Sequence, residues 1–218
     1  MFKDRLDAAT QLAQHLQAYK GKKPLVLAIP RGAVPMALHI ANALGGEMDV
    51  VLVRKLRAPH QPELAIGAVD ESGHFQLAPY AQDYGATSDY IDTEKQTQLH
   101  TIAERRKTYS ALHARISPAG RITIVVDDGM ATGASMVAAL KSVRLTQPHK
   151  LVCAVPVASP EALAKVQALA DEVVCLQAPQ YFQAVGQFYT HFPQVEDEEI
   201  AKMFADTQIH QNYKAEIE

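Results

Sequence analysis

Hydrophobic residues in the first part of the chain alternate between helical spacing and short continuous runs. Apolar side chains recur at three- and four-residue steps over 2–16, which predicts an amphipathic helix. A continuous apolar run over 25–29 then predicts a buried strand, and helical spacing returns over 34–44. The apolar run over 48–53 predicts a second buried strand. The chain therefore begins as helices and strands in alternation.

The same alternation returns after residue 120. The apolar patterns there predict three strands and two helices, which in chain order cover 121–126, 134–145, 151–155, 160–170 and 172–176. Strands that alternate with helices form parallel sheets joined by right-handed crossovers. We therefore expect an α/β fold with an open twisted, mainly parallel sheet flanked by helices, in a single domain that covers 1–218.

A long insertion, about 54–120, separates these two halves. Strand patterns on either side of the turn 70–73 predict a hairpin, and helically spaced residues over 90–114 predict a long polar helix. An insertion of this length between core strands is either a hood, or lid, over a site or an accessory packing unit. Further along, the acidic run 196–199 predicts the start of a C-terminal helix reaching to about 216, because negative charge stabilises a helix N-terminus.

Composition and charge narrow the classes of function. The 218 residues include 21 Lys and Arg against 24 Asp and Glu, a net charge of −3. The chain thus lacks the basic excess typical of nucleic-acid-binding domains. It shows neither a signal peptide pattern nor the roughly 18 consecutive apolar residues of a membrane span. Cys153 and Cys175 lie in apolar runs, as buried free thiols of a reducing compartment do. We expect a cytoplasmic protein that binds neither nucleic acid nor membrane.

The segment 122–135 carries the clearest chemical signal. It reads ITIVVDDGMATGAS, which is an apolar strand, two carboxylates, and a turn with glycine and hydroxyl residues before a helix. Open parallel sheets bind ligands beyond the carboxyl ends of their strands. A turn at a helix N-terminus offers backbone N–H groups to phosphate, and Gly133 lets the backbone approach an anion closely. Thr132 and Ser135 add hydroxyl donors. The segment therefore predicts a phosphate site beside two carboxylates.

Three other motifs do not fit this segment. A Walker A loop needs lysine where Ala134 stands, and the dinucleotide fingerprint needs three spaced glycines where only Gly129 and Gly133 are present. A hydrolase nucleophile elbow needs glycine two residues after Ser135, where Val137 stands.

The whole segment resembles the ribose-5-phosphate-binding signature of type I phosphoribosyltransferases, in which an apolar strand, two acidic residues and a Thr-Gly-x-Ser turn follow one another. Other stretches resemble the same family. Residues 28–33 look like its pyrophosphate-binding loop, and 53–55 with 62–67 look like a strand end and the hood-loop region. The tail 184–189 looks typical of an uncharacterised branch of the family. The resemblance covers about 25–200 and implies the fold expected above.

The resemblance implies a substrate, phosphoribosyl pyrophosphate with Mg²⁺, and a nitrogenous, nucleobase-like small-molecule acceptor. Asp127 and Asp128 would accept hydrogen bonds from the ribose hydroxyls and hold the metal indirectly, through water and substrate. Arg54 and Lys55 would neutralise the diphosphate as it leaves. The 5-phosphate would be bound by the turn Gly129, Met130, Ala131, Thr132, Gly133, Ala134 and Ser135. The diphosphate would be bound by Arg31 and the N–H groups of Gly32 and Ala33. Oligomers are common in this family, so the resemblance also points to a homo-oligomer.

Two positions depart from the family pattern. Purine-specific members commonly carry an acidic residue at the position of Ala131. Some uracil-using relatives have alanine at this position, as this chain does, so purine specificity of that type is in doubt. Ala33 stands where glycine is more usual, and a positive φ there would strain it by about 1–2 kcal/mol. The family's pyrophosphate loop can also hold a non-proline cis peptide bond, which a sequence does not reveal.

Several side chains and the reaction itself keep more than one interpretation. Arg105 and Arg106 either close over the site or, as we favour, belong to a solvated helix face. His60 and His74 either touch substrate or, as we favour, lie on the surface. Beside a transferase, two functions stay open: a non-catalytic regulatory protein that binds phosphoribosyl pyrophosphate, and a hydrolase of a phosphoribosyl compound.

Overall fold

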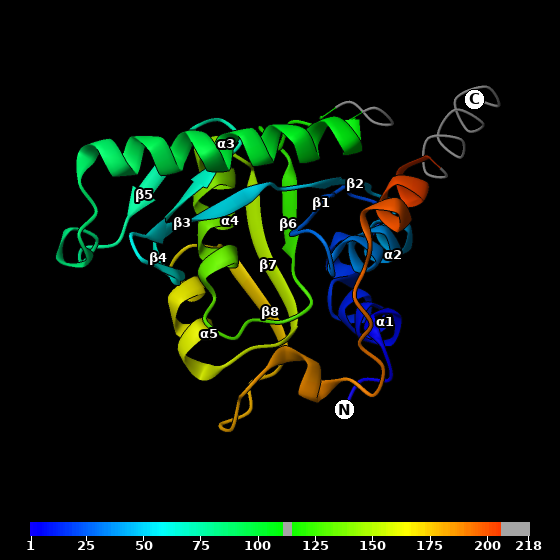
Figure 1. Ribbon diagram of the computed structural model, residues 1–218. Helices are drawn as coiled ribbons and strands as arrows, with labels where there is room; N and C mark the ends of the chain where they lie inside the picture. The colour runs from blue at the N-terminus through cyan, green and yellow to red at the C-terminus, as the bar shows by residue number, and fades with distance from the viewer. Residues whose placement is uncertain (111–114, 206–218) are drawn as a thin grey trace.

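The computed structural model describes residues 1–110 and 115–205 (Figure 1). The helices are α1 (Arg5–His15), α2 (Val34–Leu44), α3 (Ser88–Ser110), α4 (Ala134–Leu145) and α5 (Pro160–Gln167), with short 3₁₀ helices η1 (Gln17–Tyr19), η2 (Gln82–Tyr84) and η3 (Val185–Phe188). The strands are β1 (Leu25–Ala28), β2 (Glu47–Val50), β3 (Val53–Ala58), β4 (Gln61–Asp70), β5 (Phe75–Leu77), β6 (Ile122–Val126), β7 (Lys150–Val157) and β8 (Glu172–Gln177).

The central sheet has five parallel strands in the order β2-β1-β6-β7-β8. Leu25 of β1 lies between Glu47 of β2 and Thr123 of β6, which fixes the register of these three strands. All four residues of β1 are buried. Parallel strands covered on both faces appear in a sequence as continuous apolar runs, and for that reason the runs predicted this sheet correctly. The expected α/β fold is confirmed.

Helices cover both faces of this sheet (Figure 1). On one face α1 and α2 pack against it, and Ile40 of α2 shares a hydrophobic core with Ile124 of β6. On the other face α4 and α5 pack against it, and Leu140 of α4 shares a second core with Val125 of β6. Neighbouring strand residues point to opposite faces, so Ile124 and Val125 anchor one layer each.

The insertion forms a second, antiparallel sheet in the order β3-β4-β5, and α3 packs on β3 and β4 (Figure 1). β4 and β5 pair as the predicted hairpin. α3 begins at Ser88 and is helical to Ser110, while the last expected helical residues, 111–114, lie outside the described residues. The C-terminal helix is present over 197–205, and its expected continuation to about 216 also lies outside them.

The prediction of one strand over 48–53 is wrong in its second half. β2 ends at Val50, and β3 begins at Val53 in the other sheet. Val51 and Leu52, which lie between the two strands, are 5% and 3% exposed. The apolar pattern therefore continues while the chain passes from one sheet to the other. Arg54 and Lys55 consequently lie inside β3 and not at the end of a core strand.

Two smaller expectations concern thiols and membranes. Cys153 is buried and Cys175 partly buried, and both are free thiols. Within the described part of the chain, no helix combines the length and apolar character needed to cross a bilayer.

Candidate active site

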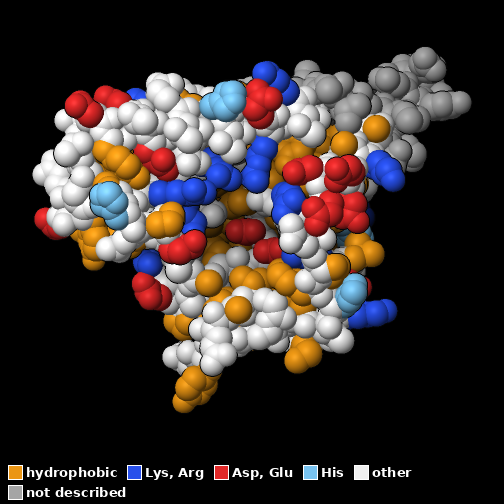
Figure 2. All heavy atoms as spheres, in the orientation of Figure 1, with side chains coloured by type: hydrophobic (Ala, Val, Ile, Leu, Met, Phe, Trp, Pro, Cys, Tyr) orange, Lys and Arg blue, Asp and Glu red, His pale blue; other side chains and the backbone are white. Residues whose placement is uncertain are grey.

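The carboxyl ends of β1 and β6 meet at one edge of the central sheet. Ala28 pairs with Val126, and the N–H of Ile29 continues the ladder to the carbonyl of Val126 at 3.0 Å. The loop after β1 and the turn after β6 therefore lie side by side. Figure 2 shows a hollow in the molecular surface, with acidic side chains inside it and basic side chains along one margin.

Arg5 of α1 holds the carboxylate of Asp128. Its Nε and Nη2 atoms lie 2.9 and 2.8 Å from Asp128 Oδ2. The guanidinium also stacks 3.7 Å from the ring centroid of Phe192 and donates to the carbonyl of Pro193 at 2.6 Å. Burial raises the pKa of Asp128, and Arg5 opposes that rise. No sequence signal indicated this pair, because Arg5 lies 123 positions away from Asp128 in the chain.

Asp127 supplies the other carboxylate of the acidic pair. Burial, followed by repulsion from the Asp128 carboxylate, raises the pKa of Asp127 well above its ordinary value. Its Oδ1 accepts the N–H of Asp128 at 2.9 Å. The hydroxyl of Tyr189 donates to the backbone carbonyl of Asp128 at 2.7 Å. The end of β6 is thus fixed in place, while its carboxylates favour a ligand that brings hydroxyl donors or a cation.

The turn over 129–135 follows the acidic pair at this edge of the sheet and leads into α4. Gly133 is the N-cap of α4 with a φ of 74°, a left-handed conformation that glycine adopts without steric cost. The N–H of Met130 donates to the carbonyl of Val157, and the N–H of Ser159 donates to that of Met130, each at 2.9 Å. The turn is therefore tied to the end of β7. The first N–H groups of α4 have no partners within the helix, which suits them to phosphate.

The predicted diphosphate loop contains a cis peptide bond between Pro30 and Arg31. Gly32 lies against the Asp128 carboxylate, so the loop and the acidic pair touch. Ala33 has a φ of −79°. The strain considered for alanine at this position therefore does not arise.

The side chain of Arg31 forms ion pairs with two acidic side chains that follow the last 3₁₀ helix. Its Nη1 lies 3.2 Å from Glu196 Oε2 and 3.8 Å from Asp197 Oδ2. Asp197 also accepts a hydrogen bond from the hydroxyl of Tyr109 on α3 at 3.0 Å. An anionic ligand on this loop would compete with these carboxylates for Arg31.

Four basic side chains line a cavity of about 330 Å³ beside the loop. They are Arg54, Lys55 and Arg57 from β3 and Arg105 from α3. Within residues 1–110 and 115–205, none of the four forms an ion pair. Among the described lining residues, Glu63 alone carries a carboxylate. Burial, followed by repulsion from Arg105 and Arg57, lowers the pKa of Arg54. Such a concentration of unpaired cations favours a polyanion.

Gln98 on α3 orients one of these cations. Arg54 Nε donates to Gln98 Oε1 at 2.9 Å, and Gln98 Nε2 donates to Glu94 Oε1 at 2.9 Å. The side chain of Gln98 is almost fully buried. Sequence reasoning did not single out Gln98 or Arg57, and it favoured a solvated position for Arg105. The only available signal for Arg105 was its spacing, three positions after Ile102 and seven after Gln98, which places the three residues on one face of a helix.

The other open candidates lie apart from this cavity. Arg106 binds Asp49 and Glu71, with Nη1 3.1 Å from Asp49 Oδ1 and Nε 2.9 Å from Glu71 Oε2. It is therefore neither a site residue nor part of a solvated face. His60 is exposed, as we favoured. His74 is exposed as well and lines a second, larger cavity.

The acidic pair fits a metal ion that reaches the protein together with its ligand. The described residues contain no cluster of three or more His, Cys, Asp or Glu side chains that could hold a metal unaided. Asp127 and Asp128 nevertheless supply hard oxygen donors. Mg²⁺ commonly takes one or two carboxylates together with waters and substrate phosphates, so this donor set suits Mg²⁺ bound to a phosphorylated substrate.

Comparison with known proteins assigns the family. The model of the phosphoribosyl transferase domain matches residues 3–191, a span that contains the acidic pair, the phosphate turn and the loop after β1. The chain belongs to the phosphoribosyl transferase family. The resemblance stated from the sequence is thereby confirmed.

Individual relatives agree with this phosphoribosyl transferase assignment. Two Mycobacterium tuberculosis proteins, from strains CDC 1551 / Oshkosh and H37Rv, carry names that assign them provisionally to the phosphoribosyl transferases. Each is 41% identical to this chain over 201 residues, which are 92% of this chain and 45% of the relative. The chain thus spans about half the length of these relatives. The crystal structure of TT1426 from Thermus thermophilus is 45% identical, with a TM-score of 0.83 and coverage of 94% of this chain and 98% of that one.

Proposed function

We propose that this chain transfers the 5-phosphoribosyl group from phosphoribosyl pyrophosphate to a nitrogenous, nucleobase-like acceptor, with Mg²⁺ and with release of pyrophosphate. The observation that carries the proposal is the contact between two anion-binding segments and one acidic pair. The phosphate turn 129–135 and the loop 30–33 flank Asp127 and Asp128, and the loop touches Asp128 through Gly32. A sugar with a phosphate at one end and a diphosphate at the other matches this order of groups.

Each segment has a role in this proposal. The N–H groups of the turn, with Thr132 and Ser135, bind the 5-phosphate. Asp127 and Asp128 accept hydrogen bonds from the ribose hydroxyls. The loop binds the diphosphate through Arg31 and through the N–H groups of Gly32 and Ala33.

The basic cavity serves the leaving group. Arg54 and Lys55, joined by Arg57 and Arg105, neutralise charge as it accumulates on the diphosphate. Mg²⁺, when bound, adds positive charge beside the same oxygens. Positioned charges of this kind stabilise a transition state without reorganisation during the reaction.

The bonds balance as a substitution at the anomeric carbon. The bond from that carbon to the diphosphate oxygen breaks, and its electron pair leaves with pyrophosphate. A bond to the acceptor nitrogen forms from the nitrogen lone pair, and the proton of that nitrogen passes to solvent. The carbon carries partial positive charge in between, which the neighbouring carboxylates of the acidic pair stabilise.

A pyrophosphate-release assay tests the proposal. The protein is incubated with phosphoribosyl pyrophosphate, Mg²⁺ and a panel of purine, pyrimidine and pyridine bases, and at least one base should give pyrophosphate and a nucleotide. Asp128→Asn should abolish turnover, whereas Asp92→Asn, which changes a carboxylate with 72% of its side chain exposed on α3, should leave it unchanged. Ala131 leads us to expect that the active base is not a purine recognised through an acidic residue in the turn.

The same assay separates the alternatives. Pyrophosphate and ribose 5-phosphate formed without any base would identify a hydrolase. Tight binding of phosphoribosyl pyrophosphate without turnover for any base would identify a regulatory protein. Absence of binding would contradict all three functions.

We also propose a cytoplasmic location and a homo-oligomer, with no nucleic-acid partner. The free thiols Cys153 and Cys175 support a reducing compartment. Sedimentation of the purified chain tests self-association, and a gel shift at several salt concentrations tests nucleic-acid binding.

A further inference from the structure

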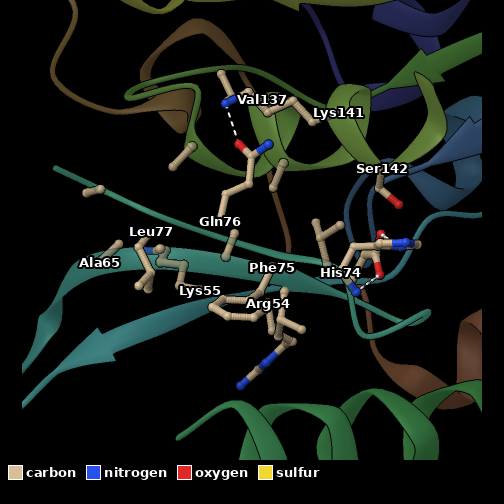
Figure 3. Close-up of a pocket in the computed structure, with 18 of the residues that line it drawn as sticks. Arg54, Lys55, Ala65, His74, Phe75, Gln76, Leu77, Val137, Lys141 and Ser142 are labelled. Atoms are coloured by element: carbon tan, nitrogen blue, oxygen red, sulfur yellow. Dashed lines mark hydrogen bonds and ion pairs between the residues drawn. The ribbon is translucent and has the colours of Figure 1, made fainter. Parts of the chain in front are cut away.

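A second cavity, of about 680 Å³, lies between α4 and the sheet β3-β4-β5 (Figure 3). Its volume is in the range of pockets that hold small organic ligands. Val137 and Lys141 project from α4, and Gln76 and Leu77 project from β5, as Figure 3 shows. Most of the surface is apolar, and Phe75 and Leu77 on its rim are each 40% exposed. Large apolar side chains exposed around one hollow favour a bound apolar group.

The charges that remain available in this cavity are positive. Lys141 Nζ donates to the neutral Gln76 Oε1 at 2.5 Å, and in the described part of the chain neither Lys141 nor Lys55 has a carboxylate partner. The carboxylate of Asp70 lines the cavity but is committed to its own turn. It is 4% exposed and accepts the N–H groups of Ser72 and His74 at 2.8 and 3.0 Å. A ligand here therefore meets apolar walls and unpaired ammonium groups.

We propose that this cavity binds an organic acid with an apolar body, such as an aromatic carboxylate or sulfonate, and that this acid is an effector. Its apolar part lies against Val137 and Leu77. Its acidic group lies between Lys141 and Lys55, where charge-assisted hydrogen bonds replace the single bond to Gln76.

The shared wall of the two cavities explains why this ligand is not the acceptor. Arg54, Lys55 and Ser135 line both the large cavity and the basic cavity beside the diphosphate loop. In a displacement at the anomeric carbon, the entering nitrogen approaches from the side opposite the leaving diphosphate. A ligand that contacts the same cations as the diphosphate lies on the wrong side for attack.

The shared cations also predict the direction of the regulation. An anion in either cavity reduces the positive potential that the other one meets, so the acid and the diphosphate oppose each other's binding. Linkage requires both affinities to fall by the same factor. This coupling rests on the proposed function for its physiological meaning, whereas binding of the acid does not.

The fluorescent aromatic sulfonate 8-anilinonaphthalene-1-sulfonate is a suitable probe, used with the folded chain of 218 residues and without substrate. We expect saturable binding to the native protein. Ala138→Trp fills the cavity from α4 and should abolish it, and Lys141→Gln should weaken it by about tenfold because one charge-assisted bond is lost. Ala103→Trp on the exposed side of α3 and Lys20→Gln, which lines neither cavity, are the matched controls and should bind as the parent does.

Thermal unfolding of every variant shows whether the fold is kept, and Val137→Trp replaces Ala138→Trp if the latter does not fold. Equal probe binding by the parent, a folded tryptophan variant and Lys141→Gln would overturn the site. Loss of probe binding on concentration-dependent dimerisation would also overturn it, because a second copy of the chain would then cover the cavity.

Inorganic pyrophosphate supplies the second measurement. It should raise the dissociation constant of the probe several-fold, and the probe should raise that of pyrophosphate by the same factor, measured by calorimetry. Probe binding that pyrophosphate does not change would overturn the effector role. If the probe binds as expected while no base supports pyrophosphate release, the proposed function fails and the site remains.

Discussion

A β-carbon on Gly32 would lie 1.9 Å from Oδ2 of Asp128. This added β-carbon would also lie 3.1 Å from Nε of Arg5. The loop after β1 and the carboxylate after β6 therefore fit together only because position 32 has no side chain. This close approach joins the segment proposed to bind diphosphate to the residue proposed to bind ribose.

Gly32→Ala should impair ligand binding more than stability. The methyl group must displace the Asp128 carboxylate and break its bonds to Arg5, which orient it. We expect the dissociation constant for phosphoribosyl pyrophosphate with Mg²⁺ to rise by about tenfold or more, the equivalent of one charge-assisted hydrogen bond. Calorimetry measures this change.

Gly21→Ala is the control for that variant. Gly21 has a φ of 76° and nothing within 4 Å of an added β-carbon. Alanine there should lower the free energy of unfolding by about 1–2 kcal/mol through backbone strain and leave binding intact. Equal binding by Gly32→Ala and the parent would contradict the proposed arrangement.

Asp127→Asn should stabilise the fold at neutral pH while it removes activity. The raised pKa of Asp127 means that the folded state binds a proton more tightly than the unfolded state does. The stability it contributes is therefore lost as the pH rises from the unfolded pKa through the folded one. Asparagine carries no charge to bury and avoids this loss, while its amide oxygen still accepts the N–H of Asp128.

Thermal unfolding at several pH values checks this prediction. The melting temperature of the variant should exceed that of the parent at pH 7 and approach it as the pH falls below 4. Asp127→Ala should gain less, because the N–H of Asp128 then loses its acceptor. A variant less stable than the parent at pH 7 would show that burial of Asp127 carries no electrostatic cost.

Arg57→Gln and Arg105→Gln should each weaken pyrophosphate binding. Both side chains line the basic cavity and lack an ion-pair partner among the described residues, so their positive charge is available to a ligand. A charge-assisted hydrogen bond contributes about 1.5–3 kcal/mol, which corresponds to roughly ten- to hundredfold in affinity.

Calorimetric titration with pyrophosphate and Mg²⁺ at two ionic strengths measures both affinity and its dependence on salt. Lys107→Gln is the matched control, since this lysine lies on the same helix, is 75% exposed and pairs with Glu104. If Arg105→Gln matches the control, the helix does not contribute to the anion site.

Arg106→Leu should destabilise the protein strongly. The two carboxylates that Arg106 binds are nearly buried, with 2% of the Asp49 side chain and 12% of the Glu71 side chain exposed. Although burial lowers the pKa of Arg106, its bonds to Glu71 and Asp49 raise that pKa overall. Removal of one partner from a buried ion pair costs about 3–5 kcal/mol, because the other charge stays uncompensated.

Urea unfolding measures the cost of that substitution. Arg144→Leu removes an exposed pair with Asp171, whose two side chains are each 42% exposed. It should cost no more than about 1 kcal/mol. A similar cost for both variants would mean that Asp49 finds another partner.

The parallel sheet and the acidic segment could be predicted because their signals are local. Every residue of the run 122–126 except Thr123 is apolar, since both faces of β6 are covered, and the carboxylates and glycines follow it directly in the chain. The strand boundary at Val50 could not be predicted, because the residues that connect the two sheets are as buried as the strands. An apolar pattern reports burial, and it does not report which sheet a residue joins.

Site residues supplied by distant segments were missed for a different reason. Arg5 reaches Asp128 across the fold, and Arg105 and Arg106 are neighbours with opposite roles. The orientation of α3 about its axis, as it packs on β3 and β4, decides that Arg105 lines the basic cavity while Arg106 binds Asp49. No property of either arginine in the sequence distinguishes them.

The bond from Arg54 to Gln98 has a consequence for the entropy of binding. A free arginine side chain carries about 2 kcal/mol of rotamer entropy, which a ligand must overcome to immobilise it. Here Nε is already bound to a buried amide, so most of that entropy is lost when the chain folds. The two terminal nitrogens of Arg54 remain for the ligand in a fixed orientation. An incoming anion then meets a preorganised cation, and less of its binding energy is spent on ordering the protein.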